Sequence, residues 1–535
     1  MTAAVAIATL GCRLNQVDSA DLALRLSERG MRTVDASMPA DVVVVNTCTV
    51  TARADASNRA VIRRLARRHP GAPIVVTGCW AQTDPRAVFA LGVDAVVGND
   101  RKSALPDIVS HLVRRRSAVC VEEAGDAGAG AAAGGAAPPG FVGSGLRPLP
   151  TANVGAAPPA AAPAPASPAS STHTGVGGAP ESTNESGIAI RGMLGSANEV
   201  GIAIRGIPES SNGFGNAAWD IAEPAAGWGM AAPARTLVAE RARAFLKVQD
   251  GCAHRCAFCI VPVARGMSRS LDPSVVLEQA RHLVSLGYRE IVLTGVDLGA
   301  YGRDLTPRTN LASLVREIVS IPSLRWVRLS SVLPAYFTDE LLEVVVGSER
   351  VAPHFHIPLQ SGSDRVLRAM KRPYNAAMYR RLVERLVGAR PEPGLGADVI
   401  VGFPGERDED FDATMSLVRA LPFSYLHVFG YSERPGTPAA VRPGRVPSAT
   451  ITRRSAALRA LGDAKGRGFR HALRGSPQEV VVLEHRERRT GKLVGLTGNY
   501  VEVRFDGTDA LMKTIARVRV TGVDACGAFG ELVAA

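Results

Sequence analysis

The sequence predicts an α/β protein with three folded parts. These are an N-terminal doubly wound parallel α/β domain, a central partial (β/α)6 barrel and a small C-terminal antiparallel β-barrel. Strand and helix patterns alternate over residues 1–120 and again over 235–473, which is typical of parallel sheets covered by helices. Residues 474–535 alternate apolar and polar residues between turns, as the strands of a small barrel do. A chain of 535 residues is long enough for several domains.

The first domain, residues 1–120, contains four consecutive valines within 41–46. This pattern is typical of a strand buried on both faces of a parallel sheet. We expect strands at 5–9, 41–46, 74–77 and 94–97, and helices at 19–29 and 59–69.

Residues 121–234 are rich in Ala, Pro, Gly and Ser, and almost no bulky core residue occurs before Ile188. Such a composition cannot bury enough apolar surface to offset the entropy lost on ordering. The stretch 184–192 recurs almost unchanged at 198–206, but two copies are too few for a solenoid. We therefore predict a disordered linker or insertion that acts as a passive tether.

The central domain, residues 235–473, has six strand patterns spaced as in a barrel, and the active site of such a fold lies at the carboxyl ends of its strands. The strands are expected at 244–248, 290–294, 326–330, 354–358, 396–401 and 425–431.

The tail, residues 474–535, should form a five-stranded barrel, with strands that include 480–483, 492–496, 500–505 and 515–520. Its basic side chains are Arg486, Arg488, Arg489, Lys492 and Arg504. A small basic barrel often binds RNA, although a solvated charged face would have the same composition.

The net charge of +12 suits a polyanionic partner. Eight cysteines in so long a chain do not suggest a disulfide scaffold, and their clustering indicates metal binding in a reducing compartment. No apolar run reaches the length of a membrane span, and the N-terminus lacks the basic region of a secretion signal. We therefore expect a cytoplasmic protein.

The spacing Cys252-x-x-x-Cys256-x-x-Cys259 follows the first strand of the barrel. Iron–sulfur cubes usually have four cysteine ligands, so three imply an iron with an open position. The alternative is zinc, but zinc sites usually add a second cysteine pair or histidines, and His254 has an awkward spacing for this role. The run 247–262 resembles the signature of radical S-adenosylmethionine (SAM) enzymes, including the aromatic Phe258.

A second set of three cysteines lies in the first domain. Cys12, Cys48 and Cys79 each follow a predicted strand, and the ends of parallel strands meet at one edge of a doubly wound sheet. They could be ordinary buried cysteines, but placement after three strands favours a second cluster with an open iron. Cys120 and Cys526 match no such pattern.

The whole arrangement resembles the methylthiotransferases, a branch of the radical SAM enzymes whose terminal barrel is called TRAM. The matching strings are LGCRLNQ at 10–16, NTCTVT at 46–51, VTGCWAQ at 76–82, HIPLQSGS at 356–363, DVIVGFPGE at 398–406 and YSERPGTP at 431–438. The residues that follow Cys48 look like the branch that acts on N6-threonylcarbamoyladenosine beside the anticodon of tRNA. The long linker departs from the family pattern.

The resemblance implies a transferase that inserts a methylthio group at C2 of that base, with two 4Fe–4S clusters and SAM. Cys252, Cys256 and Cys259 would hold the cluster at which SAM is cleaved, and Cys12, Cys48 and Cys79 would hold an auxiliary cluster. Phe258 would pack near SAM, and Asp297, Ser331, Gln360 and Gly402 are candidates for contacts with it. Arg265 could neutralise the SAM carboxylate or form a structural salt bridge. The partners would be the tRNA anticodon stem-loop, approached by a basic helix with Arg59, Arg63, Arg64, Arg67 and Arg68, and an electron donor such as flavodoxin or ferredoxin.

Other functions remain open from the sequence. The substrate could be isopentenyladenosine in tRNA or an aspartate of a ribosomal protein. A non-enzyme alternative is an RNA-binding iron–sulfur redox sensor, in which the tail supplies the affinity and the clusters report redox state.

Overall fold

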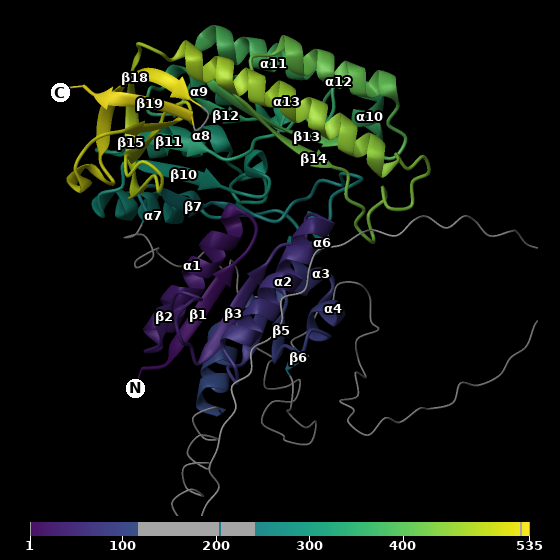
Figure 1. Cartoon of the computed structure of the whole chain (residues 1–535), viewed down its shortest axis with the longest axis vertical. Helices are drawn as coiled ribbons and strands as arrows, with labels where there is room; N and C mark the ends of the chain where they lie inside the picture. The colour runs from purple at the N-terminus through teal and green to yellow at the C-terminus, as the bar shows by residue number, and fades with distance from the viewer. Residues whose placement is uncertain (1, 116–202, 205–240, 525–526, 534–535) are drawn as a thin grey trace, which may run out of the picture. The chain divides into compact units, whose positions relative to one another are not determined.

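The structure is a computed structural model that describes residues 2–115, 203–204, 241–524 and 527–533 (Figure 1). The N-terminal domain is a six-stranded sheet with the order β2-β1-β3-β4-β5-β6. Its pairs are parallel except β5–β6, which is antiparallel. The strands are β1 Ala4–Thr9, β2 Arg32–Val34, β3 Val42–Thr47, β4 Ile74–Gly78, β5 Ala95–Val97 and β6 Ala203–Ile204.

Helices cover both faces of this sheet, so the doubly wound fold is confirmed. Val42 and Val44 of β3 pack into one apolar core with Leu22 and Leu26, whereas the alternate valines of β3 pack into a second core on the other face. The helices are α1 Arg13–Glu28, α2 Ala52–Arg68, α3 Cys79–Thr83, α4 Pro85–Phe89, the 3₁₀ helix η1 Asn99–Ala104, and residues 105–115.

Several details of this domain differ from the expectation. Helix α1 begins at Arg13, six residues before the predicted start. Strand β2 was not predicted, because it is short and largely exposed and so has no apolar pattern. Helix α2 begins seven residues before the predicted start, since the Thr51 hydroxyl accepts from the Ala54 N–H and caps the helix there. Ala203–Ile204 lie inside the stretch expected to be linker, yet they pair with β5. The rest of 121–234 lies outside the described residues.

The central domain contains two three-stranded parallel sheets, with the orders β11-β10-β7 and β12-β13-β14. A parallel bridge between Val327 and Val351 connects the end strands of the two sheets. The six strands therefore follow one another as in an incomplete barrel, as predicted. They are β7 Ala244–Lys247, β10 Glu290–Thr294, β11 Trp326–Leu329, β12 His354–His356, β13 Gly394–Val401 and β14 Tyr425–Gly430, with the short pair β8 Gln249–Asp250 and β9 Arg269–Ser270 beside them.

One large apolar core lies between these strands and the helices outside them. Alternate residues of β13, such as Leu395 and Val399, belong to this core, so the residues between them face the inner side of the barrel. Figure 1 shows α12 and α13 running along β13 and β14. The helices are α6 Val261–Arg265, α7 Pro273–Ser285, η2 Leu298–Ala300, α8 Leu311–Val319, η3 Pro334–Tyr336, α9 Asp339–Gly347, α10 Asp364–Ala369, α11 Ala376–Ala389, α12 Asp408–Ala420 and α13 Ser448–Ala472.

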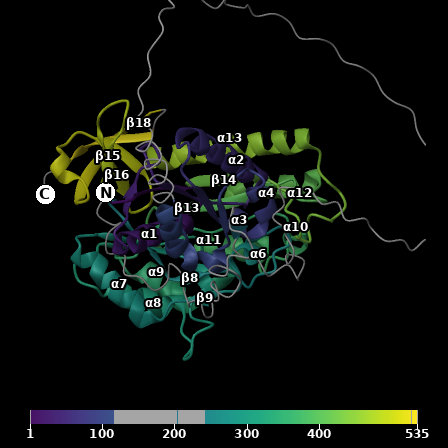
Figure 2. The same cartoon turned by 90° about the horizontal axis from the view of Figure 1, so that it is seen from below.

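The tail forms a closed five-stranded barrel with the order β15-β16-β17-β19-β18 (Figure 1 and Figure 2). The predicted barrel is confirmed, but the pair β17–β19 is parallel rather than antiparallel. The reason is parity, because neighbours cannot all alternate in direction around a ring of five strands. The elements are β15 Pro477–Arg486, β16 Leu493–Thr497, β17 Glu502–Phe505, η4 Asp509–Leu511, β18 Ile515–Asp524 and β19 Gly527–Leu532.

Candidate iron–sulfur and cofactor site

The cysteines of the first domain leave neighbouring strands of the sheet. Cys12 follows β1, Cys48 follows β3 and Cys79 follows β4, and these three strands are adjacent. Burial, together with the nearby thiols of Cys79 and Cys12, raises the pKa of Cys48 to about 11. The three thiols therefore lie close enough for their charges to interact, as the sequence predicts.

Two glycines explain the Gly-Cys pairs in the sequence. Gly11 has a φ of +98°, and a Cβ on it would lie 2.5 Å from the Cβ of Cys48. Gly78 has a φ of +99°, and a Cβ there would lie 2.4 Å from the Thr47 carbonyl oxygen. Only glycine combines this backbone conformation with so close an approach. The two glycines thus let the turns after β1 and β4 come close to the end of β3.

Buried asparagines fix these turns. The Asn15 amide donates to the carbonyls of Leu10 and Thr47, at 2.7 and 2.9 Å, and so connects the ends of β1 and β3. The Asn58 amide donates to the Cys48 carbonyl at 2.5 Å. These two asparagines hold the backbone of the turns, whereas Asn99 donates to the Cys79 sulfur itself at 3.6 Å.

The cysteines of the barrel lie in the loop between β8 and α6, at the carboxyl end of the first strand. The Cys259 N–H donates to the Cys256 carbonyl at 3.2 Å, so the loop turns tightly between these two residues. Burial raises the pKa of Cys252 to about 12, with Asp297 adding to the effect. Burial also raises the pKa of Cys259 to about 11.

Arg372 contacts this second trio, and no local sequence pattern predicts the contact. Its Nη1 donates to the Cys256 sulfur at 3.1 Å, across 116 positions of the chain. A guanidinium in this place stabilises thiolate charge, as a ligand set for iron requires.

The sulfur spacing in both trios argues against a single metal ion. A tetrahedral zinc with Zn–S bonds of about 2.3 Å would hold its sulfurs roughly 3.8 Å apart. Within the described part of the chain, the one group of His, Cys, Asp and Glu whose donor atoms all lie within 4.8 Å of one another contains no cysteine. Neither trio therefore has the spacing of a single-ion zinc site, whereas an iron–sulfur cube binds each cysteine through a different iron and needs no such close approach.

The candidate SAM contacts lie at the ends of successive strands, but their surroundings differ. The Asp297 carboxylate is 3.3 Å from His254 Nε2 and accepts from the Tyr336 hydroxyl at 3.2 Å, which places it beside the cysteine loop. Gln360 is buried and its Oε1 has no hydrogen-bond partner in the described structure. A buried unpaired acceptor is costly unless a ligand satisfies it, so Gln360 fits a ligand contact.

The other three candidate SAM contacts, Phe258, Ser331 and Gly402, lie in different surroundings. Phe258 packs at the edge of a small core formed by Ala257, Phe403 and their neighbours. Ser331 is exposed at the end of β11. Gly402 has its N–H satisfied by the Glu406 carboxylate at 3.1 Å, and a Cβ on it would lie 2.4 Å from Ile451, so its contacts are structural.

Arg265 forms a structural ion pair, which was one of the two roles expected for it. Its Nη1 lies 3.0 Å from the Asp250 carboxylate, and its Nη2 lies 3.2 Å from Asp18 of the first domain. Asp18 also pairs with Lys102 and Lys247, each at 2.7 Å. These five buried groups join the two cysteine-bearing domains, and the cations exceed the carboxylates by one charge.

This charge lies next to the auxiliary trio. Burial alone would lower the pKa of Arg265, but Asp250 and then Cys79, Asp18 and Cys12 raise it well above its usual range. An excess cation among thiolates offsets part of their repulsion, so the network suits an anionic cluster.

A second buried pair connects the same domains. The Arg434 guanidinium donates to the Asp55 carboxylate through both Nη atoms, at 2.8 Å each, and to the Thr49 carbonyl. Asp55 lies on α2 and Thr49 directly follows Cys48, so the motif at 431–438 contacts the auxiliary loop. The pairing joins residues 379 positions apart and could not be read from the sequence.

The basic residues expected to contact RNA are exposed to different degrees. On α2, Arg63, Arg64, Arg67 and Arg68 are exposed, whereas Arg59 stacks over the Trp80 ring at 5.0 Å. In the tail, several cations are already paired: Arg486 with Asp509, Lys492 with Asp506 and Arg504 with Asp524.

Cys120 and Cys526 lie outside the described residues. Within the part of the chain that is described, no helix is long and apolar enough to cross a membrane.

Comparisons with known proteins agree with this geometry. Residues 246–418 match the model of the radical SAM superfamily, and residues 4–98 match that of the uncharacterized protein family UPF0004. The threonylcarbamoyladenosine tRNA methylthiotransferase MtaB of Bacillus subtilis is 31% identical over 522 residues, 97% of this chain and 94% of the relative. The MtaB of Aquifex aeolicus is 32% identical over 512 residues, 96% of this chain and 98% of the relative.

Among solved structures, the radical S-adenosylmethionine methyltransferase TsrM from Kitasatospora setae, with cobalamin and a [4Fe-4S] cluster bound, has a TM-score of 0.48 at 14% identity. The match covers 82% of this chain and 77% of TsrM. The MtaB relatives extend the similarity over all three folded domains. The chain therefore belongs to the MtaB family of radical SAM methylthiotransferases.

Proposed function

We propose that this protein inserts a methylthio group at C2 of N6-threonylcarbamoyladenosine beside the anticodon of tRNA. The observation that carries the proposal is the pairing of two cysteine trios at the strand ends of two domains that a buried ion network joins. Relatives named for this reaction match nearly the whole chain.

Cys252, Cys256 and Cys259 would hold the cluster that binds SAM, and Cys12, Cys48 and Cys79 the auxiliary cluster. With SAM bound, such a cluster supplies an electron that generates a 5′-deoxyadenosyl radical, which can activate an unreactive C–H bond. Arg372 donates to the Cys256 sulfur, and Asp297 and Gln360 would present polar groups to the cofactor.

The protein's own contribution is to bind and orient the tRNA base and the cofactor and to exclude water from the site. The ion network of Arg265 and Asp18 holds the first domain on the barrel, so that both trios can act on one base. The exposed arginines of α2 attract the phosphate backbone. A flavodoxin or ferredoxin is the class of electron donor that we infer, and the cytoplasm is the compartment where tRNA and such donors meet.

The test is product analysis on defined tRNA. Full-length protein, reconstituted anaerobically, would be incubated with SAM, a reductant and tRNA that carries threonylcarbamoyladenosine, and the nucleosides would be measured by mass spectrometry. We expect one methylthio group in place of a base hydrogen. Matched tRNAs with isopentenyladenosine or unmodified adenosine should stay unchanged. Methylthiolation of the isopentenyl substrate instead, or of none, would reject the proposal.

A further inference from the structure

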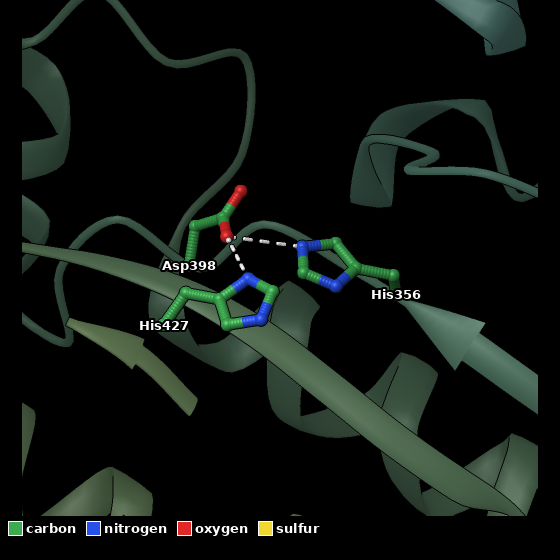
Figure 3. Close-up of side chains that lie close together, drawn as sticks. All are labelled: His356, Asp398 and His427. Atoms are coloured by element: carbon green, nitrogen blue, oxygen red, sulfur yellow. Dashed lines mark hydrogen bonds and ion pairs between the residues drawn. The ribbon is translucent and has the colours of Figure 1, made fainter. Parts of the chain in front are cut away.

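Two histidines and an aspartate converge on the inner side of the barrel. The Asp398 Oδ1 lies 3.1 Å from His356 Nε2 and 3.2 Å from His427 Nδ1. Donor atoms of all three lie within 4.8 Å of one another. Figure 3 shows both imidazole rings directed at the same carboxylate oxygen.

The strands place these side chains together. His356 ends β12, Asp398 lies in β13 and His427 lies in β14. Asp398 and His427 are register partners, and β12 pairs with β13 two residues before Asp398. The neighbours of these residues along each strand belong to the core under the helices, so the trio faces the barrel interior.

Each of the two nitrogen–oxygen spacings fits one metal ion. Zinc bonds to imidazole nitrogen and carboxylate oxygen are about 2.0–2.2 Å long. Two such donors are therefore separated by about 2.9 Å at a right angle and by roughly 3.4 Å at the tetrahedral angle. The observed 3.1 and 3.2 Å fall between these limits.

The surroundings also resemble a metal site. The Tyr425 hydroxyl lies 3.0 Å from His356 Nδ1, and it lies 2.8 Å from His354 Nε2. A partner on the far nitrogen of a histidine fixes the ring orientation and the tautomer, as it does around metals. Exposure rises across the trio, from 9% for the His356 side chain to 25% for Asp398 and 54% for His427. The open side leaves room for a water or an oxygen ligand.

We propose that His356, Asp398 and His427 bind one divalent transition-metal ion of the zinc or ferrous class, separately from both cysteine trios. Two imidazoles and one carboxylate are the donor set that such ions accept while keeping a coordination position open. The proposal does not depend on which tRNA base the enzyme modifies.

Zinc is the probe, because its uptake can be measured beside iron. Full-length protein with both cysteine trios loaded with iron and sulfide would be given excess Zn²⁺ and desalted, and its metals counted by mass spectrometry. We expect about one zinc per chain, and zinc K-edge X-ray absorption with nitrogen and oxygen neighbours. No zinc uptake, or sulfur as the main neighbour, would overturn the proposal.

Variants locate the site. Asp398→Asn and His427→Ala should lose the zinc, and Tyr425→Phe should weaken its binding about 10–100-fold by releasing His356. His485→Ala, at an exposed histidine of the tail barrel, is the matched control and should keep it. Iron content and circular dichroism show that each variant is folded and loaded. Equal zinc in the control and in all three variants would contradict the assignment.

Discussion

The Arg265 guanidinium lies 3.2 Å from the Asp18 carboxylate, and this ion pair crosses from the barrel to the first domain with both side chains at most 5% exposed. Arg265 ends the short helix that follows Cys259, and Asp18 lies on the helix that follows Cys12. One contact therefore fixes the two cysteine loops relative to each other. The ion pair offsets part of the cost of burying both charged side chains at this interface.

Removing the Asp18 charge should destabilise the protein strongly. In Asp18→Asn, the buried cations Lys102, Lys247 and Arg265 would lose the carboxylate that they share, and breaking a buried pair costs about 3–5 kcal/mol. Urea unfolding at neutral pH would measure this as a lower midpoint. The control Asp339→Asn removes an exposed pair with Arg385 and should change little. Equal midpoints for the two variants would contradict the role assigned to the network.

Variants of the two cysteine trios should separate SAM cleavage from methylthio transfer. Cys48→Ala should halve the iron of the reconstituted protein from about eight to about four per chain and abolish methylthiolation, yet keep reductive SAM cleavage. Cys256→Ala should lose the cleavage as well. Iron analysis and chromatography of 5′-deoxyadenosine check both. If Cys48→Ala kept all its iron, the auxiliary trio would not be a cluster site.

Arg372 should raise the reduction potential of the cluster beside it, because its cation favours the added electron. Only the difference in the free energy of this contact between the reduced and the oxidised cluster shifts the potential, and a difference of about 1.4 kcal/mol corresponds to about 59 mV for one electron. The potential of Arg372→Gln should therefore fall by roughly 60 mV. Redox titration followed by electron paramagnetic resonance measures it. An unchanged potential would show that the contact with Cys256 has no electronic effect.

The sequence was sufficient for features that depend on local pattern, and insufficient for those that depend on distant contacts. Three cysteines, each placed directly after an apolar strand, predicted where the thiols meet, because parallel strand ends share an edge. The contact of Arg372 with Cys256 spans 116 positions, and no local pattern encodes it. His356 and Asp398 lie in two separate motifs and His427 in neither, and their donor atoms meet only through strand register, which no local pattern encodes.

The iron-free thiols should react slowly at neutral pH. Burial raises the pKa of Cys48 to about 11, so its reactive thiolate is scarce and should increase about tenfold per pH unit up to that value. Alkylation of Cys48 in iron-free protein, followed by mass spectrometry from pH 7 to 10, tests this, with urea-unfolded protein as the control. A rate that levels off near pH 8.5 would mean an ordinary thiol. Since the bound form is the thiolate, iron loading should release protons and improve with rising pH.

The exposed arginines of α2 should contribute to tRNA binding through charge alone. Replacing Arg63, Arg64, Arg67 and Arg68 with Gln should weaken binding and reduce the slope of log K against log salt by about 3–4, given about 0.7–0.9 per phosphate contact. Fluorescence anisotropy measured from about 50 to about 300 mM salt gives that slope. The matched control replaces four exposed arginines of other helices, Arg316, Arg381, Arg385 and Arg419. Both sets remove four charges, so a purely non-specific effect of net charge would lower the slope equally in each. A drop confined to the α2 set would place the phosphate backbone along that helix.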